Sequence, residues 1–217
     1  MQTNTKLLTT LAMLAALSIL AMLFIRFTMF APFLTYDPKD VIIIIGGFLF
    51  GPMAAMSIIV VVSFIEMITV SDTGFWGLLM NIIASTSLVI PAVLIYRRWR
   101  SLPGAVAGLI TGVVMVTGIM LLWNYLIVPL YMPAVARADV IPMLVPVFLP
   151  FNLVKSSLNA AVAMMLYKPV SMALKHAGLY RPATVENSGR LNIWVILISA
   201  FAVLSLVLVI LVERGVL

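Results

Sequence analysis

The chain has 217 residues, of which 64% are hydrophobic and only 9% are charged, and its formal net charge is +6. A soluble domain carries about 25% charged residues, so this composition excludes a water-soluble globular protein. It predicts an all-α integral membrane protein, because lipid removes the need for a polar surface. The absence of cysteine excludes disulfides, thiolate nucleophiles and zinc–thiolate sites.

Six apolar runs follow one another along the chain, separated by polar or proline-rich breaks. A bilayer core ~30 Å thick needs about 20 apolar residues in each helical span. The runs cover residues 7–25, 41–70, 75–96, 102–130, 142–167 and 191–212. The first is too long for the apolar region of an ordinary signal peptide and has no clear cleavage site after it, so we interpret it as the first span.

The run 41–70 allows two interpretations. Thirty residues of helix measure ~45 Å, which is too long for one upright span, and Gly46-Gly47 and Gly51-Pro52 interrupt the run. It is either one tilted, kinked helix or two helices that fold back at Gly51-Pro52. The length of the run and its glycines favour two crossings, which predicts seven spans in total.

Clusters of basic residues predict the orientation of the chain. The breaks at 97–100 and 168–190 hold seven of the thirteen Lys and Arg residues: Arg97, Arg98, Arg100, Lys168, Lys175, Arg181 and Arg190. The positive-inside rule places both loops in the cytoplasm, and the single histidine, His176, is expected to be solvated there. With two crossings in 41–70 the N-terminus is also cytoplasmic, whereas one crossing would place it outside.

Two ionisable residues lie inside the apolar runs, and such residues are costly in lipid. Glu66 is four residues from the end of its run, so extension to the interface and a functional role are equally compatible with its position. Lys155 lies about eight residues into the stretch that begins near Pro146, or ~12 Å deep. We therefore expect Lys155 to have polar partners.

Lys155 belongs to a polar stripe on one helical face. Asn152, Lys155, Ser156 and Asn159 follow the spacing i, i+3, i+4 and i+7. Hydrogen bonding between helices is the favoured interpretation for Ser156 and Asn159. Ligand binding is favoured for Asn152 and Lys155, because packing between helices does not require a positive charge.

Two further amides, Asn81 and Asn124, lie in other apolar runs, and Asn124 stands between Trp123 and Tyr125. An aromatic belt at the membrane interface would explain the two rings but not the amide. Amides, one cation and aromatic rings together suit a planar polar heterocycle, whose faces contact rings and whose edges form hydrogen bonds.

Small residues recur at the spacing of close helix contacts. Gly104, Gly108 and Gly112 form a doubled G-x-x-x-G, and Ala12 and Ala16 form a similar pair in the first run. Internal packing is the favoured interpretation for the glycines, although the spacing is equally compatible with a partner subunit.

The sequence also lacks the signatures of a membrane enzyme. It contains no G-x-x-x-x-G-K-[ST] motif for ATP binding. Its apolar runs contain no Cys, His or Asp, so they offer neither a catalytic dyad nor a metal site. We therefore predict that the chain is not an enzyme.

Three stretches carry a family resemblance: L-T-Y-D-P-K-D-V at 34–41, G-G-F-L-F-G-P at 46–52 and P-F-N-L-V-K at 150–155. They resemble the riboflavin-specific substrate-binding (S) components of energy-coupling-factor (ECF) vitamin transporters, the RibU type. The resemblance implies a six-helix binding unit over residues 1–180, followed by a linker and an extra C-terminal transmembrane helix over 181–217. It also implies that an extracellular loop, 27–40, caps the ligand.

The resemblance implies that riboflavin is a transported ligand rather than a cofactor, and that the chain needs no cofactor. Asn152 and Lys155 would contact the polar edge of the isoalloxazine ring. Position alone suggests further contacts, with the last three in the capping loop: Asn124, Asn81, Leu34, Tyr36 and Asp40.

The same resemblance implies partners. Ala12 and Ala16 would dock a transmembrane coupling subunit of the EcfT type, and two cytoplasmic ATPases would supply the energy. One alternative is an S component for FMN or another vitamin, with the outer residues Arg26 and Lys39 near a phosphate. Another is a non-transport membrane scaffold whose polar stripe only joins helices.

Overall fold

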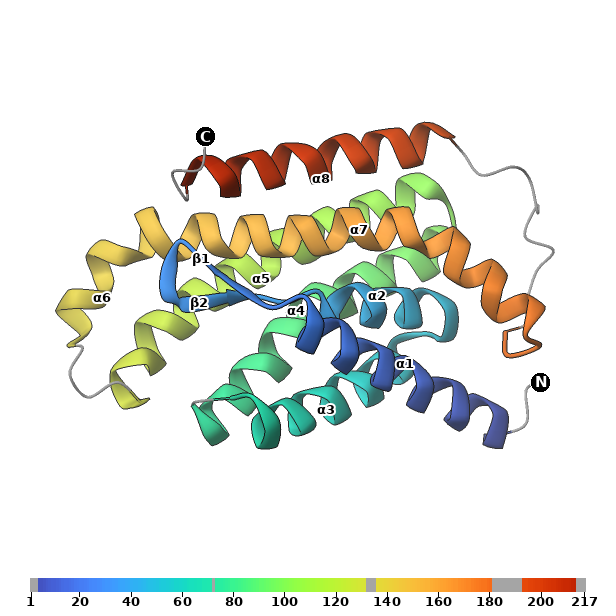
Figure 1. Cartoon of the computed structure of the whole chain (residues 1–217), viewed down its shortest axis with the longest axis horizontal. Helices are drawn as coiled ribbons and strands as arrows, with labels where there is room; N and C mark the ends of the chain where they lie inside the picture. The colour runs from blue at the N-terminus through green and yellow to red at the C-terminus, as the bar shows by residue number, and fades with distance from the viewer. Residues whose placement is uncertain (1–3, 72, 132–135, 181–192, 214–217) are drawn as a thin grey trace.

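The computed structural model describes residues 4–71, 73–131, 136–180 and 193–213, which form helices and one β-hairpin (Figure 1). Within these residues, five helical stretches are long and apolar enough to cross a membrane. The elements are α1 Asn4–Phe24, β1 Phe27–Met29, β2 Ala31–Tyr36, α2 Lys39–Phe50, α3 Pro52–Thr69, α4 Gly74–Trp99, α5 Leu102–Tyr131, α6 Arg137–Met143, the π-helical turn η1 Leu144–Phe148, α7 Leu149–His176 and α8 Ile193–Glu213. The all-α membrane architecture is confirmed.

The run 41–70 folds back at Gly51-Pro52, as expected. Gly51 has φ +99°, a conformation that glycine adopts without strain, and Pro52 opens α3, where a missing N–H costs nothing. However, α2 has only 12 residues, or ~18 Å. The prediction that 41–70 makes two full crossings is wrong, because α2 is shorter than the ~30 Å bilayer core and cannot span it by itself. The hairpin and α2 lie end to end along the long axis of the bundle (Figure 1).

Two basic segments expected in loops are largely helical. α4 continues through Arg97 and Arg98, and α7 continues to His176 and includes Lys168 and Lys175. Cations are favourable in the last turn of a helix, where they face the negative end of its dipole. Arg181 and Arg190 lie outside the described residues.

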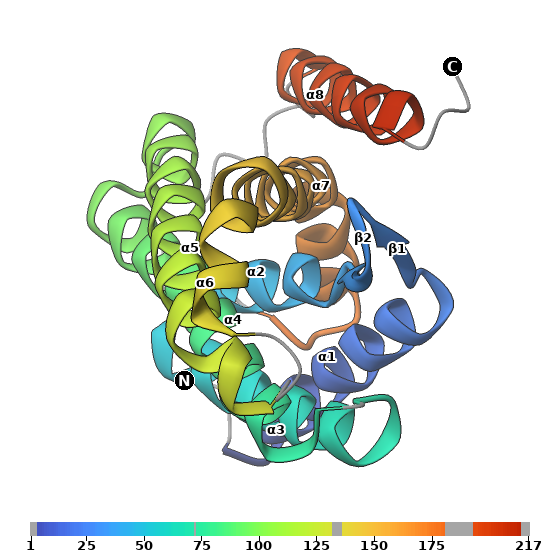
Figure 2. The same ribbon diagram turned by 90° about the vertical axis from the view of Figure 1, so that its left-hand side faces the viewer.

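The helices pack around two hydrophobic clusters. The larger cluster contains residues from helices α1, α2, α3, α4, α5 and α7. Ile44, Ala55 and Val89 in this cluster are fully buried. The second lies under the hairpin and against α7, and Ile210 of α8 contributes to it. α8 packs along α7 and lies on the far side of that helix from α1 (Figures 1 and 2).

The doubled G-x-x-x-G holds α5 against α4, which confirms the interpretation of internal packing. A Cβ on Gly108 would lie 2.6 Å from the carbonyl oxygen of Ala92, and one on Gly112 would clash with the carbonyl oxygen of Leu88. The missing side chains therefore allow direct contact between the two backbones.

We predict that Gly112→Ala destabilises the protein by at least about 1 kcal/mol, because the added methyl group forces α4 and α5 apart. Gly118→Ala on the same helix is the matched control. Nothing lies within 4 Å of a Cβ at Gly118, so this variant keeps or slightly gains stability through helix propensity. Reversible unfolding in SDS measures both changes, and equal effects would contradict the packing role.

Candidate ligand-binding site

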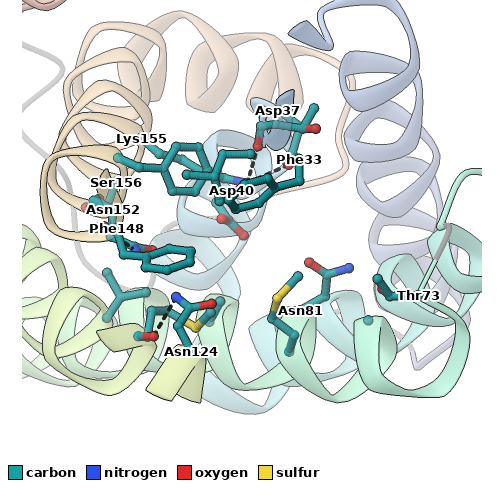
Figure 3. A pocket seen from close by; sticks show the side chains of 18 of the residues that line it. Phe33, Asp37, Asp40, Thr73, Asn81, Asn124, Phe148, Asn152, Lys155 and Ser156 are labelled. Atoms are coloured by element: carbon teal, nitrogen blue, oxygen red, sulfur yellow. Dashed lines mark hydrogen bonds and ion pairs between the residues drawn. The ribbon is translucent and has the colours of Figure 1, made fainter. Parts of the chain in front are cut away.

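A cavity of about 270 Å³ lies between the hairpin and helices α3, α4, α5 and α7 (Figure 3). Six of the seven binding residues expected from the sequence line it: Leu34, Asp40, Asn81, Asn124, Asn152 and Lys155. Tyr36 does not line the cavity; its ring packs 5.1 Å from the ring of Phe27 within the hairpin. Among the described residues, no cluster of His, Cys, Asp or Glu is placed to hold a metal ion.

The hairpin covers one side of the cavity. Its strands pair in antiparallel register, with Phe27 opposite Tyr36 and Thr28 opposite Thr35. Residues 32–35 of β2 line the cavity. The loop expected to cap a ligand is therefore a short β-structure, and its side chains form part of the cavity wall.

Phenylalanines supply the aromatic lining. Phe33 on the hairpin and Phe148 at the end of η1 lie 6.1 Å apart between ring centroids, and Phe151 on α7 also lines the cavity. Trp123 and Tyr125 are not among the residues that line it, whereas Asn124 between them is. A helix directs neighbouring residues about 100° apart, so Asn124 lines the cavity while Trp123 packs against the larger hydrophobic cluster.

Two of the amides are held by their own helices. The Nδ2 of Asn124 donates to the Met120 carbonyl at 2.8 Å, and the Nδ2 of Asn152 donates to the Phe148 carbonyl at 2.7 Å. Both side chains are nearly buried, with 5% and 7% exposed. These bonds fix the amide planes at the end of the cavity formed by α5 and α7 (Figure 3).

Lys155 fastens the capping segment to α7. Its Nζ donates to Asp37 Oδ2 at 2.7 Å and to the Thr35 carbonyl at 3.1 Å. One turn further on, Asn159 Nδ2 donates to the Asp37 carbonyl at 3.3 Å. Lys155 also lies 5.7 Å from the centroid of the Phe151 ring. The expected polar partners of Lys155 are thus present, and the ammonium group both joins two segments and faces the cavity.

A second buried ion pair, Lys39–Glu66, was not expected from the sequence. Lys39 is 2% exposed, and its Nζ binds Glu66 and donates to Asn81 Oδ1 at 3.0 Å. The interpretation of Lys39 as an outer residue near a phosphate is therefore wrong. The extension of Glu66 to the interface is also wrong, because its carboxylate is buried against Lys39.

Asp37 connects the two ion pairs, a role that the sequence alone did not predict. Burial raises the pKa of its carboxyl, but the positive charges of Lys155 and Lys39 outweigh this effect and hold the pKa below its usual range. Its Oδ1 is 4.0 Å from Lys39 Nζ. Nearby, Asp40 accepts a hydrogen bond from Ser85 at 2.6 Å. The stretch Asp37-Pro38-Lys39-Asp40 is typical of a solvated turn, and only the tertiary fold shows that it is buried.

We predict that Lys39→Met destabilises the protein by about 3 kcal/mol, because it leaves the Glu66 charge buried without its cation. Adding Glu66→Gln removes that charge and recovers most of the loss. Unfolding in SDS of the two variants and of the unaltered protein measures the difference. If the double variant is no more stable than Lys39→Met, the ion pair does not explain the buried charges.

The chain is similar to known proteins over most of its length. Residues 6–167 match a family model described as the substrate-specific component of ECF transporters. The chain is 30% identical over 181 residues to the riboflavin transporter RibU of Staphylococcus aureus (strain TCH60), covering 81% of this chain and 95% of the relative. It is 26% identical over 143 residues to the riboflavin transporter FmnP of Bacillus subtilis (strain 168), covering 62% and 75%.

A solved S component of a bacterial ECF transporter has the same arrangement. It superposes with a TM-score of 0.67 at 28% sequence identity, covering 80% of this chain and 99% of the solved one. The matched part of the chain therefore accounts for nearly the whole of that structure.

Proposed function

The chain belongs to the substrate-specific components of ECF transporters, and on that premise we propose that it binds riboflavin for uptake by an ATPase-driven coupling module. It is a multi-pass membrane protein, and its long helices carry the cavity between them. The relatives named as riboflavin transporters support the choice of ligand.

The observation that carries the proposal is the combination of groups around the cavity. A flavin has a flat apolar ring, polar atoms along one ring edge and a hydroxylated side chain. Phe33 and Phe148 offer ring faces, while Asn152 and Lys155 offer polar groups at the same end of the cavity. Contacts to ring faces and hydrogen bonds to ring edges are the means by which proteins bind such heterocycles.

The proposed orientation places the hairpin and the cavity toward the outside. A Cβ on Gly51 would lie 2.6 Å from the Arg97 guanidinium, so the α2–α3 turn lies at the basic end of α4. The N-terminus of α1 lies at this same end of the bundle (Figure 1). The positive-inside rule makes it the cytoplasmic end, which gives a cytoplasmic N-terminus.

The proposed docking surface for a coupling subunit of the EcfT type is the face of α1 that carries Ala12 and Ala16. Both residues are exposed, and α8 packs on the opposite side of the bundle, against α7. In this proposal two cytoplasmic ATPases bound to that subunit drive transport.

The purified protein is expected to bind riboflavin with quenching of flavin fluorescence, and Lys155→Ala is expected to weaken binding by about tenfold or more. The reason is the loss of a charged hydrogen-bond donor from the cavity wall. Lys175→Ala, at the exposed cytoplasmic end of the same helix, is the control and keeps the affinity of the unaltered protein. Absence of riboflavin binding to the folded, unaltered chain would refute the proposal.

Ala12→Trp is expected to abolish riboflavin uptake while binding of riboflavin is unchanged, because the indole prevents close approach of a partner helix. Ala200→Trp, at an exposed position on α8, makes the same change on the other side of the bundle and is expected to transport normally. Uptake by vesicles containing the coupling module measures both. Normal transport by Ala12→Trp would contradict the docking assignment.

A further inference from the structure

The three asparagine amides on the cavity wall differ in which atom is held by the protein and which atom is left for a ligand. Asn124 and Asn152 each use Nδ2 to donate to a carbonyl of their own helix, which turns their acceptor oxygens away from that helix. Asn81 has the reverse arrangement, because its Oδ1 accepts from Lys39 Nζ at 3.0 Å. An ammonium group only donates, so the atom of Asn81 beside Lys39 is its oxygen and the NH₂ group points elsewhere. Figure 3 shows the nitrogen of Asn81 on the side away from Asp40.

Lys39 is itself held in place from several directions. Glu66 binds its ammonium group, Asp37 Oδ1 lies 4.0 Å away, and the residue is 2% exposed. The ion pair keeps this buried lysine charged, and its contacts hold the ammonium group beside Asn81. It therefore keeps the Asn81 amide from rotating by 180°, which would bring two donors together.

The residues that line the cavity near Asn81 carry different polar groups from those near Asn152. Ser71 and Thr73 line the cavity near the start of α4, as does Arg26. Asn81 and Thr73 lie together at one end of the cavity, whereas Asn124, Asn152 and Phe148 lie at the other (Figure 3). One end therefore offers hydroxyls, an amide NH₂ group and the Glu66 carboxylate, and the other offers rings and amide oxygens.

We infer that Lys39 is a positioning residue for the ligand: with Glu66 it holds Asn81 as a hydrogen-bond donor to the hydroxylated side chain of the flavin. The imide edge of the ring then faces Asn152 at the opposite end. This inference rests on the proposed function as a riboflavin-binding protein. It adds a role for a buried lysine that does not itself line the cavity, although its partner Glu66 does.

The chemistry of oxidised flavins supports this direction. Their ring has one N–H donor, in the imide, and amide oxygens such as that of Asn152 can accept from it. The ribityl hydroxyls are strongly hydrated in water, so burial of this side chain requires hydrogen-bond partners. Asn81, Ser71 and Thr73 supply such partners at the other end.

Two flavin analogues test the two ends separately. Lumiflavin has the same ring but a methyl group in place of the ribityl chain, and 3-methylriboflavin has no imide N–H. We expect Asn81→Ala to reduce the preference for riboflavin over lumiflavin by about tenfold, the size of one lost buried hydrogen bond, and to leave the effect of imide methylation unchanged. Asn152→Ala is the matched control and is expected to show the reverse pattern.

The role of Lys39 is tested by the Lys39→Met/Glu66→Gln variant, which removes both charges together. The riboflavin-to-lumiflavin preference of this double variant is expected to fall as in Asn81→Ala, while the cost of imide methylation stays as in the unaltered protein. Glu66 lines the cavity, so Glu66→Gln alone is the control, and its preference is expected to fall less than that of the double variant. A merely structural role would change both ratios alike. Dissociation constants from fluorescence quenching supply all of these ratios.

The outcomes are distinct. An unchanged preference in Asn81→Ala, or equal changes at both ends, overturns the direction of the ligand, and this test does not depend on the folding of the double variant. An unchanged preference in a folded double variant overturns the role of Lys39. If the unaltered protein binds none of the three flavins, the proposed function itself fails.

Discussion

The structure depends on a buried network of charges that joins the capping segment to the helices around it. Asp37 lies between the hairpin and α2, and it contacts Lys155 of α7 directly and Lys39 at a longer distance. Lys39 continues the network to Glu66 of α3 and Asn81 of α4. An unpaired charge in such a place costs several kcal/mol, so the cap, α3, α4 and α7 are held in one arrangement. The cavity is the space that this arrangement encloses.

This network also explains how one helix serves two purposes. The sequence pattern of the polar stripe on α7 favours helix packing for Ser156 and Asn159 and ligand binding for Asn152 and Lys155. In the structure Asn159 does hold another segment, through the Asp37 carbonyl, but Lys155 does the same while it lines the cavity. A lysine ammonium group has three donors, and two of them are used by Asp37 and Thr35. The remaining donor is what makes a ligand contact compatible with a structural role.

The sequence predicted those features that follow from local chemistry. Apolar run lengths located the long membrane helices, Gly51-Pro52 favoured a fold-back, and the glycines of α5 indicated close internal packing without identifying α4 as the partner. It did not predict that Asp37 and Lys39 are buried, because hydropathy treats a short charged segment as solvated. Their partners, Lys155 and Glu66, lie far away in the chain. The choice of Phe33 and Phe148 over Trp123 and Tyr125 likewise depends on helix rotation and on the hairpin.

A structure of the protein determined with riboflavin bound tests the central claim most directly, namely that the charged network shapes a flavin site. The account predicts the ring against Phe33 and Phe148, with Lys155 in contact with its polar edge and the Asp37–Lys155 and Lys39–Glu66 pairs intact. Riboflavin outside this cavity, or bound within it with both ion pairs broken, would contradict the account.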